Sequence, residues 1–157
     1  MFNVILHIVI DYYNFLKGWN MIKGQCIHQQ ILKTLAKSGH GNKILIADGN
    51  YPIMTNANES AEKIYLGFAP NLPLVTDVLK SIVTEINIEQ IEVMEPNEGK
   101  TPEIFNEFNN IVGDKLLTSY SRKQFYEMAN EKDVTLVINT GDTRTYANIM
   151  LTVGVVS

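Results

Sequence analysis

The chain has 157 residues, a length typical of one domain rather than two. Its hydrophobic fraction of 45% and charged fraction of 19% exclude an intrinsically disordered protein. Its net charge of −4 argues against a protein that holds nucleic acid through a broad basic surface.

The first twenty residues form a segment of their own. An apolar run from Phe2 to Ile10 is interrupted by Asn3 and His7, and it ends at Asp11. No basic stretch precedes it and no small-residue cleavage site follows it, so it does not fit a signal peptide. Two interpretations remain open: residues 1–20 are an N-terminal extension that starts at the wrong Met, or they add a strand or helix to the body. The domain proper is expected to span residues 21–157.

Apolar spacing and end signals predict helices over about 27–37, 72–86, 102–112 and 122–130. Gly39 ends the first helix, and Pro73 lies in the first turn of the second. Thr101 is the expected N-cap of the third helix, and Ser121 opens a capping box for the fourth.

Short apolar runs between these helices predict strands at 43–47, 63–67, 88–94, 115–119, 134–138 and 149–156. This alternation indicates an α/β fold: one compact layered domain with a largely parallel sheet flanked by helices. Ligands tend to bind at the carboxyl ends of the strands in such sheets. Two polar clusters lie there, one at Asp48 and one at Thr140–Asp142.

His40 is the first candidate for chemistry. It lies between Gly39 and Gly41 just after the first predicted helix, so it is expected at a helix C-terminus that favours a cation. Histidine exchanges protons near neutral pH and suits general acid–base work. The alternative is a surface loop residue, which is the more common fate of such a histidine.

Arg122 and Lys123 are a second candidate group, because they stand in the first turn of a helix, where the dipole disfavours cations. Tyr126 follows Arg122 by four residues, so both side chains share one helix face. A third group, the polar loop 139–148, ends in Tyr146 and Asn148, which are suited to hydrogen-bonding a polyhydroxyl ligand. Solvated cations and a plain connecting loop are the alternatives.

Several signatures of other functions are absent. The sequence contains no nucleotide-binding glycine motif and no serine-nucleophile motif, so no cofactor is expected. Cys26 is the only cysteine, which excludes an internal disulfide and fits a reducing compartment, so we expect a cytoplasmic protein. The histidines are too far apart for a short zinc motif, and no apolar run is long enough to cross a membrane.

Taken together, these segments resemble the ribose pyranase / fucose mutarotase family (RbsD/FucU). The resemblance runs from about Met21 to Val156. It is carried by Gly39-His40-Gly41, Ala47-Asp48-x-Asn50-Tyr51-Pro52, Arg122 with Phe125-Tyr126-Glu127, and Tyr146-Ala147-Asn148-Ile149.

The resemblance implies a cofactor-free enzyme that interconverts cyclic forms of a free monosaccharide. By position, His40 matches the family's proton donor, and Asp48, Arg122, Tyr146 and Asn148 match its sugar-binding positions. Tyr126 matches a position of the fucose branch. The family also builds homo-oligomeric rings, often decamers, with sites between neighbouring subunits.

Arg122 stands near a position where the ribose branch carries a histidine, so the resemblance favours an L-fucose mutarotase. A D-ribose pyranase, a non-catalytic sugar-binding module and a protein that binds no sugar remain as alternatives. In the preferred mechanism, His40 protonates the ring oxygen, and Asp48 holds the sugar and orients the His40 ring. The partner base is left open between Tyr126 and a water molecule.

Overall fold

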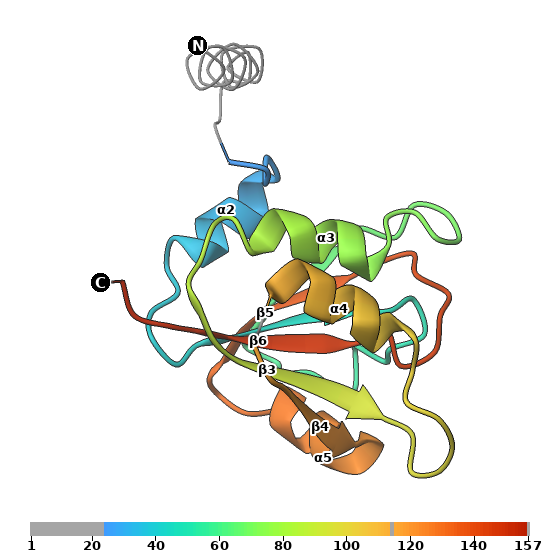
Figure 1. Ribbon diagram of the computed structural model, residues 1–157. Coiled ribbons are helices and arrows are strands. Elements are labelled where there is room, and N and C mark those ends of the chain that lie inside the picture. Colours follow the sequence, from blue (N-terminus) through green and yellow to red (C-terminus); the bar gives the residue numbers. More distant parts are fainter. Residues whose placement is uncertain (1–23, 114, 157) are drawn as a thin grey trace, which may run out of the picture.

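A six-stranded sheet organises the part of the chain that the computed structural model describes, residues 24–113 and 115–156 (Figure 1). The expected extension at residues 1–20 lies outside these residues. The strand order is β2-β5-β1-β6-β3-β4. The strands are β1 (Lys43–Ala47), β2 (Glu62–Tyr65), β3 (Ile88–Glu95), β4 (Leu117–Ser121), β5 (Val134–Asn139) and β6 (Ile149–Val153).

The sheet is parallel except at β6. Strands β2 and β1 run parallel to β5, and β4 runs parallel to β3, whereas β6 is antiparallel to both of its neighbours. No helix separates β5 from β6, so the loop 140–148 returns the chain in the opposite direction. The predicted α/β fold with a largely parallel sheet is therefore confirmed, and β6 joins its two parallel halves.

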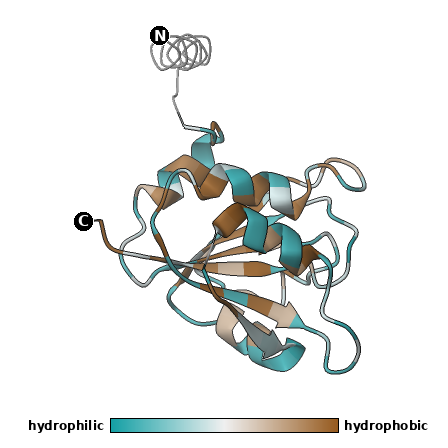
Figure 2. Cartoon of the chain, in the orientation of Figure 1, coloured by the Kyte–Doolittle hydropathy of each residue, from teal (hydrophilic) through white to brown (hydrophobic). Residues whose placement is uncertain are grey.

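Helices cover both faces of this sheet. Figure 1 shows α2 (Gln29–Leu35), α3 (Val75–Ile82) and α4 (Ile104–Val112) on one face, and α5 (Arg122–Ala129) on the other. Phe108 and Leu79 belong to the core of the first face, and Phe125 and Leu45 to that of the second. Figure 2 shows the matching pattern, with hydrophobic strands and helices whose two sides differ in hydropathy.

The start of α5 follows the local sequence closely. The Ser121 hydroxyl accepts from the backbone N of Gln124 at 3.4 Å, and the Gln124 side chain accepts from the backbone N of Ser121 at 3.2 Å. This reciprocal capping box confirms the predicted helix start. It also places Arg122 and Tyr126 one turn apart on the helix that packs beside the carboxyl end of β3.

Other predicted boundaries were wrong because contacts between distant segments set them. Helix α3 begins at Val75, after Pro73, where the buried Asp142 carboxylate accepts from the Val75 backbone N at 3.1 Å. Helix α4 is capped by Glu103 rather than Thr101. Helix α2 ends at Leu35, so the next four residues lead into the His40 loop.

Two strand boundaries also differ from the predictions. Strand β4 lies at Leu117–Ser121, two residues later than expected, because its register is set by pairing with β3. Strand β6 ends at Val153 rather than at residue 156, since its pairing with β3 reaches no further than the start of β3 at Ile88. Such shifts change where side chains meet at the ends of the sheet.

Candidate active site

A polar hollow of about 160 Å³ lies at the carboxyl ends of β1 and β3, where the loop before β6 and the first turn of α5 also meet. This is the edge of the sheet at which ligands were expected. Five of the six predicted site residues line it. The full lining is Asp48, Asn50, Tyr51, Met94, Arg122, Tyr126, Thr145, Tyr146 and Asn148.

Asp48 is the buried acid of this hollow, with 3% of its surface exposed. One carboxylate oxygen accepts from the backbone N of Asn50 at 2.8 Å, and the other accepts from Nδ2 of Asn148 at 2.8 Å. Asn148 is held in turn, because its Oδ1 accepts from the Asp48 backbone N at 2.9 Å. The two side chains therefore form a closed, preorganised pair.

Burial raises the pKa of the Asp48 carboxyl above its usual value. The hydrogen bonds from Asn50 and Asn148 lower the pKa and offset part of that rise, while the nearby charge of Asp142 adds to it. A carboxylate has roughly four lone-pair sites, so Asp48 retains acceptor capacity beyond its two protein bonds. It can accept hydrogen bonds from hydroxyl groups of a ligand.

Arg122 and Tyr146 form the opposite rim. The guanidinium donates from Nη2 to the Tyr146 hydroxyl at 3.1 Å, and its carbon lies 5.4 Å from the Tyr146 ring centroid. Tyr146 has φ of 63°, a left-handed conformation that is costly for a residue with a side chain. With this backbone conformation, Tyr146 lines the same hollow as Asn148. Both residues precede β6, so strand alternation does not set their orientation.

Two further aromatic rings complete the wall. Tyr51 and Tyr126 pack edge to face, with ring centroids 5.3 Å apart. The Tyr51 hydroxyl donates to the carbonyl of Asn56 at 2.8 Å, and burial raises the pKa of this phenol. Tyr51 thus supplies a fixed apolar surface, whereas Tyr126 lies at the hollow with its side chain less deeply buried.

The second polar cluster, Thr140–Asp142, supports the hollow from behind rather than lining it. Asp142 is fully buried, and Arg144 donates to it from Nε at 3.0 Å and from Nη2 at 2.7 Å. Burial acts to raise the pKa of Asp142, but the hydrogen bonds from Arg144 and Val75 outweigh it and lower the pKa below the usual value. Arg144 also donates to Glu107 at 2.7 Å, which ties the loop to α4.

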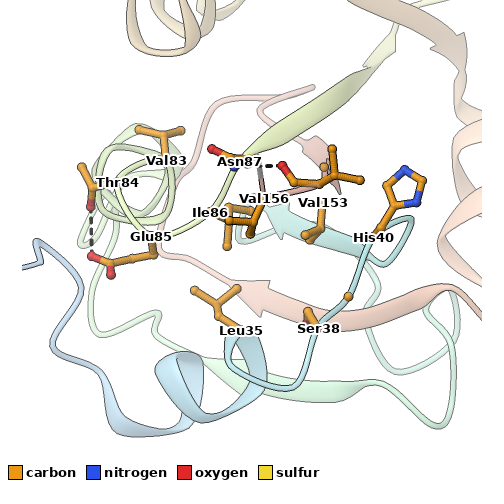
Figure 3. Close-up of a pocket in the computed structure, with 13 residues that line it drawn as sticks. Leu35, Ser38, His40, Val83, Thr84, Glu85, Ile86, Asn87, Val153 and Val156 are labelled. Carbon is orange, nitrogen blue, oxygen red and sulfur yellow. Dashed lines mark hydrogen bonds between the residues drawn. The ribbon is translucent and has the colours of Figure 1, made fainter.

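His40 lies at the other end of β1, away from this hollow. Helix α2 ends at Leu35, so the expected place of His40 at a helix C-terminus was wrong. Its imidazole borders a separate pocket of about 630 Å³, with Glu85 on the opposite side of that pocket (Figure 3). Within one chain, Asp48 therefore cannot orient the His40 ring, because strand β1, five residues and roughly 16 Å long, lies between the two residues.

Sequence reasoning missed several contributors to these two regions. Asn50 and Tyr51 were named only within a motif, yet they hold and wall the hollow. Glu89, which meets His40 at 2.7 Å, was not singled out at all. No local signal marks Glu89, because it reaches His40 from a strand 49 positions later in the chain.

No group of three or more His, Cys, Asp or Glu side chains that could hold a metal ion occurs in residues 24–113 and 115–156. Over the same residues, no helix is both long enough and apolar enough to cross a membrane. The polar groups of the hollow instead match a small ligand rich in hydroxyl groups, by their acceptors, donors and aromatic faces.

Comparison with known proteins decides the family. The sequence profile of the RbsD / FucU transport protein family matches residues 21–156. The chain belongs to this family. One relative is the D-ribose pyranase of Clostridium perfringens (strain ATCC 13124), which is 30% identical over 87% of this chain and 99% of its own length. Another is the D-ribose pyranase of Geobacillus thermodenitrificans, 30% identical over 86% of this chain and 98% of its own.

Solved structures agree with this membership. Bacillus subtilis RbsD complexed with D-ribose superposes with a TM-score of 0.73 at 29% identity, covering 87% of this chain and all of that one. The fucose mutarotase of Streptococcus pneumoniae in complex with L-fucose gives a TM-score of 0.72 at 30% identity, covering 83% of this chain and 95% of that one. RbsD/FucU proteins bound to two different sugars are thus similar to this chain to the same degree.

Proposed function

We propose that this chain is an isomerase that interconverts the cyclic forms of a free monosaccharide, with L-fucose mutarotation as its main reaction. The observation that carries the proposal is the buried Asp48–Asn148 pair, which opens into a hollow rimmed by Arg122 and Tyr146. Its relatives include a D-ribose pyranase and family members bound to D-ribose and to L-fucose, which supports the same chemistry.

The hollow recognises a sugar through complementary groups. Asp48 accepts hydrogen bonds from sugar hydroxyls, and the Arg122 guanidinium donates through nitrogens that Tyr146 does not occupy. The rings of Tyr126 and Tyr146 pack against the apolar C–H face of the sugar. Because Asp48 and Asn148 are already fixed by each other, little ordering cost is expected on binding.

His40 serves as the general acid, supplied to this hollow by a second copy of the chain. Its Nδ1–H or Nε2–H bond breaks as the ring oxygen gains the proton, the ring C–O bond breaks, and the anomeric hydroxyl gives its proton to water or to Tyr126. Closure from the other carbonyl face inverts the anomeric centre. Because His40 and Asp48 lie at opposite ends of β1, the proposed enzyme is a homo-oligomer. The resemblance to the family implies a decameric ring as its form.

Arg122 carries the preference for L-fucose together with Tyr126 and the Asn50-Tyr51-Pro52 turn, since the resemblance to the fucose branch rests on these three features. D-ribose pyranase activity is the second candidate, favoured by the D-ribose pyranases that match over nearly their whole length. The two candidates share the hollow and differ in the sugar that fits it.

Saturation-transfer NMR on the purified full chain tests the proposal. Exchange between α and β anomers is measured for L-fucose, D-ribose and a small panel of other free sugars under one set of conditions. We expect the largest acceleration for L-fucose. A larger effect on D-ribose would make the chain a pyranase.

A binding assay by calorimetry with the same sugars separates the remaining alternatives. Binding without acceleration of any exchange would identify a non-catalytic sugar-binding module. Neither binding nor acceleration would leave an interaction protein, and either result would contradict the proposed isomerase.

A further inference from the structure

We propose that Glu89 is a positioning residue for His40, which holds the proton on Nε2 and leaves Nδ1 as the nitrogen that exchanges a proton with the sugar. This inference rests on the proposed function and deepens it. It starts from one contact: Oε2 of Glu89 lies 2.7 Å from Nε2 of His40, a distance typical of a charge-assisted hydrogen bond.

The contact is of little use for folding. The His40 side chain is 59% exposed and the Glu89 side chain 46% exposed, and ion pairs at such sites add little to stability. A short, aligned contact between two exposed side chains is therefore better explained by what it does to the imidazole than by what it does for the fold.

The backbone around the pair fixes both partners. The Gly41 backbone N donates to the Val153 carbonyl at 2.9 Å, and the Val153 N donates to the Asn42 carbonyl at 2.8 Å. These bonds attach the His40 loop to the end of β6. Gly41 has φ of 84°, a conformation that glycine adopts without strain, so the loop can turn directly after His40.

A second set of contacts brings the strand of Glu89 to the same place. The backbone N of Gly154 donates to the Asn87 carbonyl at 2.8 Å, which attaches the end of β6 to the start of β3. A Cβ at Gly154 would lie 3.4 Å from the Cβ of Glu89, an ordinary contact distance, so Gly154 lies directly beside Glu89. The end of β6 thus connects the loop of His40 to the strand of Glu89.

The chemistry of the contact selects the reacting nitrogen. An ionised carboxylate only accepts hydrogen bonds, so the ring nitrogen that faces Glu89 is the one that carries a proton. Neutral His40 is then the Nε2–H tautomer, with a lone pair on Nδ1. The imidazolium carries a second proton, on Nδ1. Among the described residues, none is hydrogen-bonded to Nδ1, so the imidazolium is free to donate this proton to a sugar oxygen, and the lone pair that remains on Nδ1 is free to take up a proton again.

Three variants of the full chain test the role by anomer-exchange NMR. Glu89→Gln keeps the reach of the side chain but removes its charge. Glu89→Asp keeps the charge but withdraws it by one C–C bond, about 1.5 Å. Glu62→Gln is the matched control, because Glu62 is an exposed glutamate on edge strand β2 of the same sheet.

For Glu89→Gln, we expect kcat to fall about tenfold, part of the roughly 10²–10⁴-fold that a positioned acid–base group contributes, with KM almost unchanged. Glu89→Asp should also lower kcat, because the shorter side chain no longer reaches Nε2 at the same distance, and Glu62→Gln should change neither kcat nor KM.

A wild-type chain that accelerates no sugar would refute the proposed function, and an unchanged kcat in Glu89→Gln would refute the positioning role. The tautomer gives a readout independent of activity. Two-bond ¹H–¹⁵N spectra at alkaline pH should show His40 as the Nε2–H tautomer in the wild-type chain and as a mixture in Glu89→Ala. An identical pattern in both would overturn the inference even if the enzyme proves inactive.

Discussion

The two ends of strand β1 are built in contrasting ways. At the carboxyl end, Asp48 is buried and both of its carboxylate oxygens are hydrogen-bonded within the chain. At the amino end, His40 lies in an exposed loop with one partner, Glu89. The carboxyl end is therefore rigid and internally hydrogen-bonded, whereas the amino end carries an exposed imidazole with a single partner.

Under the proposed function, the buried carboxyl end of β1 binds the sugar and the exposed amino end transfers the proton. A buried acid fixed by a neighbouring amide gives a rigid subsite, which lowers the cost of ordering on binding. An exposed imidazole on a short loop can insert into a subsite that it does not help to build. Each chain would thus carry both the sugar subsite at Asp48 and the proton donor His40. Because the two lie at opposite ends of β1, a second copy of the chain would be needed to bring a His40 to each subsite.

The largest expected effect comes from removing the proton donor. His40→Ala should lower the rate of anomer exchange by about 10²–10⁴-fold, the usual contribution of a general acid–base group, with sugar affinity retained. His28→Ala is the matched control, because His28 caps α2 and lies outside both regions. Saturation-transfer NMR gives the rate and calorimetry the affinity. An unchanged rate for His40→Ala would remove it from the mechanism.

Mixing two inactive variants sharpens the same comparison. Asp48→Asn should bind sugar poorly, because the anionic acceptor is lost while the shape is kept. Unfolded and refolded together with His40→Ala, it should regain measurable exchange activity, since some sites then combine an intact Asp48 with an intact His40 from another copy. Separately refolded variants are the control. No recovery in the mixed sample would mean that the two residues do not share a site.

A smaller effect, on stability, is expected at the buried support of the hollow. Asp142→Ala should lower the free energy of unfolding by about 3 kcal/mol, because it leaves Arg144 and the first turn of α3 without their buried acceptor. Glu89→Ala should cost no more than about 0.5 kcal/mol, as expected for an exposed pair. Urea unfolding at one fixed protein concentration measures both, and equal losses would contradict the contrast between the two ends.

The pH dependence of the stability that Asp142 contributes has a definite sign, and Asp142→Asn is the variant that tests it. The pKa of Asp142 is lowered in the folded state, so its ionisation favours folding above the pKa of the unfolded chain. This contribution disappears as the pH falls through the lower, folded pKa. Below about pH 4, near the ordinary carboxyl value, the wild-type chain should therefore approach the stability of Asp142→Asn. A difference that persists undiminished into acid would refute this account.

How much of this could be predicted from the sequence depended on the range of the interactions. Periodicity located the helices and strands, and the capping box at Ser121 marked the start of α5, because these signals are local. The start of α3 and the end of β6 were misplaced, since a distant carboxylate sets the one and the extent of pairing with β3 sets the other.

The candidate site divides in the same way. Arg122 and Tyr126 could be placed on one face because they lie on one helix. Asp48, just after β1, and Asn148, just before β6, could be placed at the same edge of the sheet. The position of His40 was wrong because the apolar spacing extended α2 past its actual end at Leu35. Glu89 could not have been found, since only the pairing of β3 with β6 brings it to the loop.

The smallest expected effect concerns a third acid, Glu92 of β3, which lies between the two ends. It is 4% exposed, its Oε2 has no hydrogen-bond partner within the described chain, and burial raises the pKa of its carboxyl despite the nearby Lys43. Unlike Asp48, this carboxylate has an oxygen without a hydrogen-bond partner, and Lys43 and Thr152 offset only part of the cost of its burial, so ionised Glu92 destabilises the folded state at neutral pH.

Glu92→Gln should therefore stabilise the protein by about 1 kcal/mol at pH 7, the low end of the cost of an unsatisfied buried polar group. The sign follows from the raised pKa: the gain is present where folded Glu92 is ionised and disappears as the pH falls through that pKa. Thermal unfolding from pH 7 to pH 4 measures it, with the exposed Glu62→Gln as control. A loss of stability at pH 7 would contradict this prediction. It would show that the ionised Glu92 carboxylate stabilises the folded state.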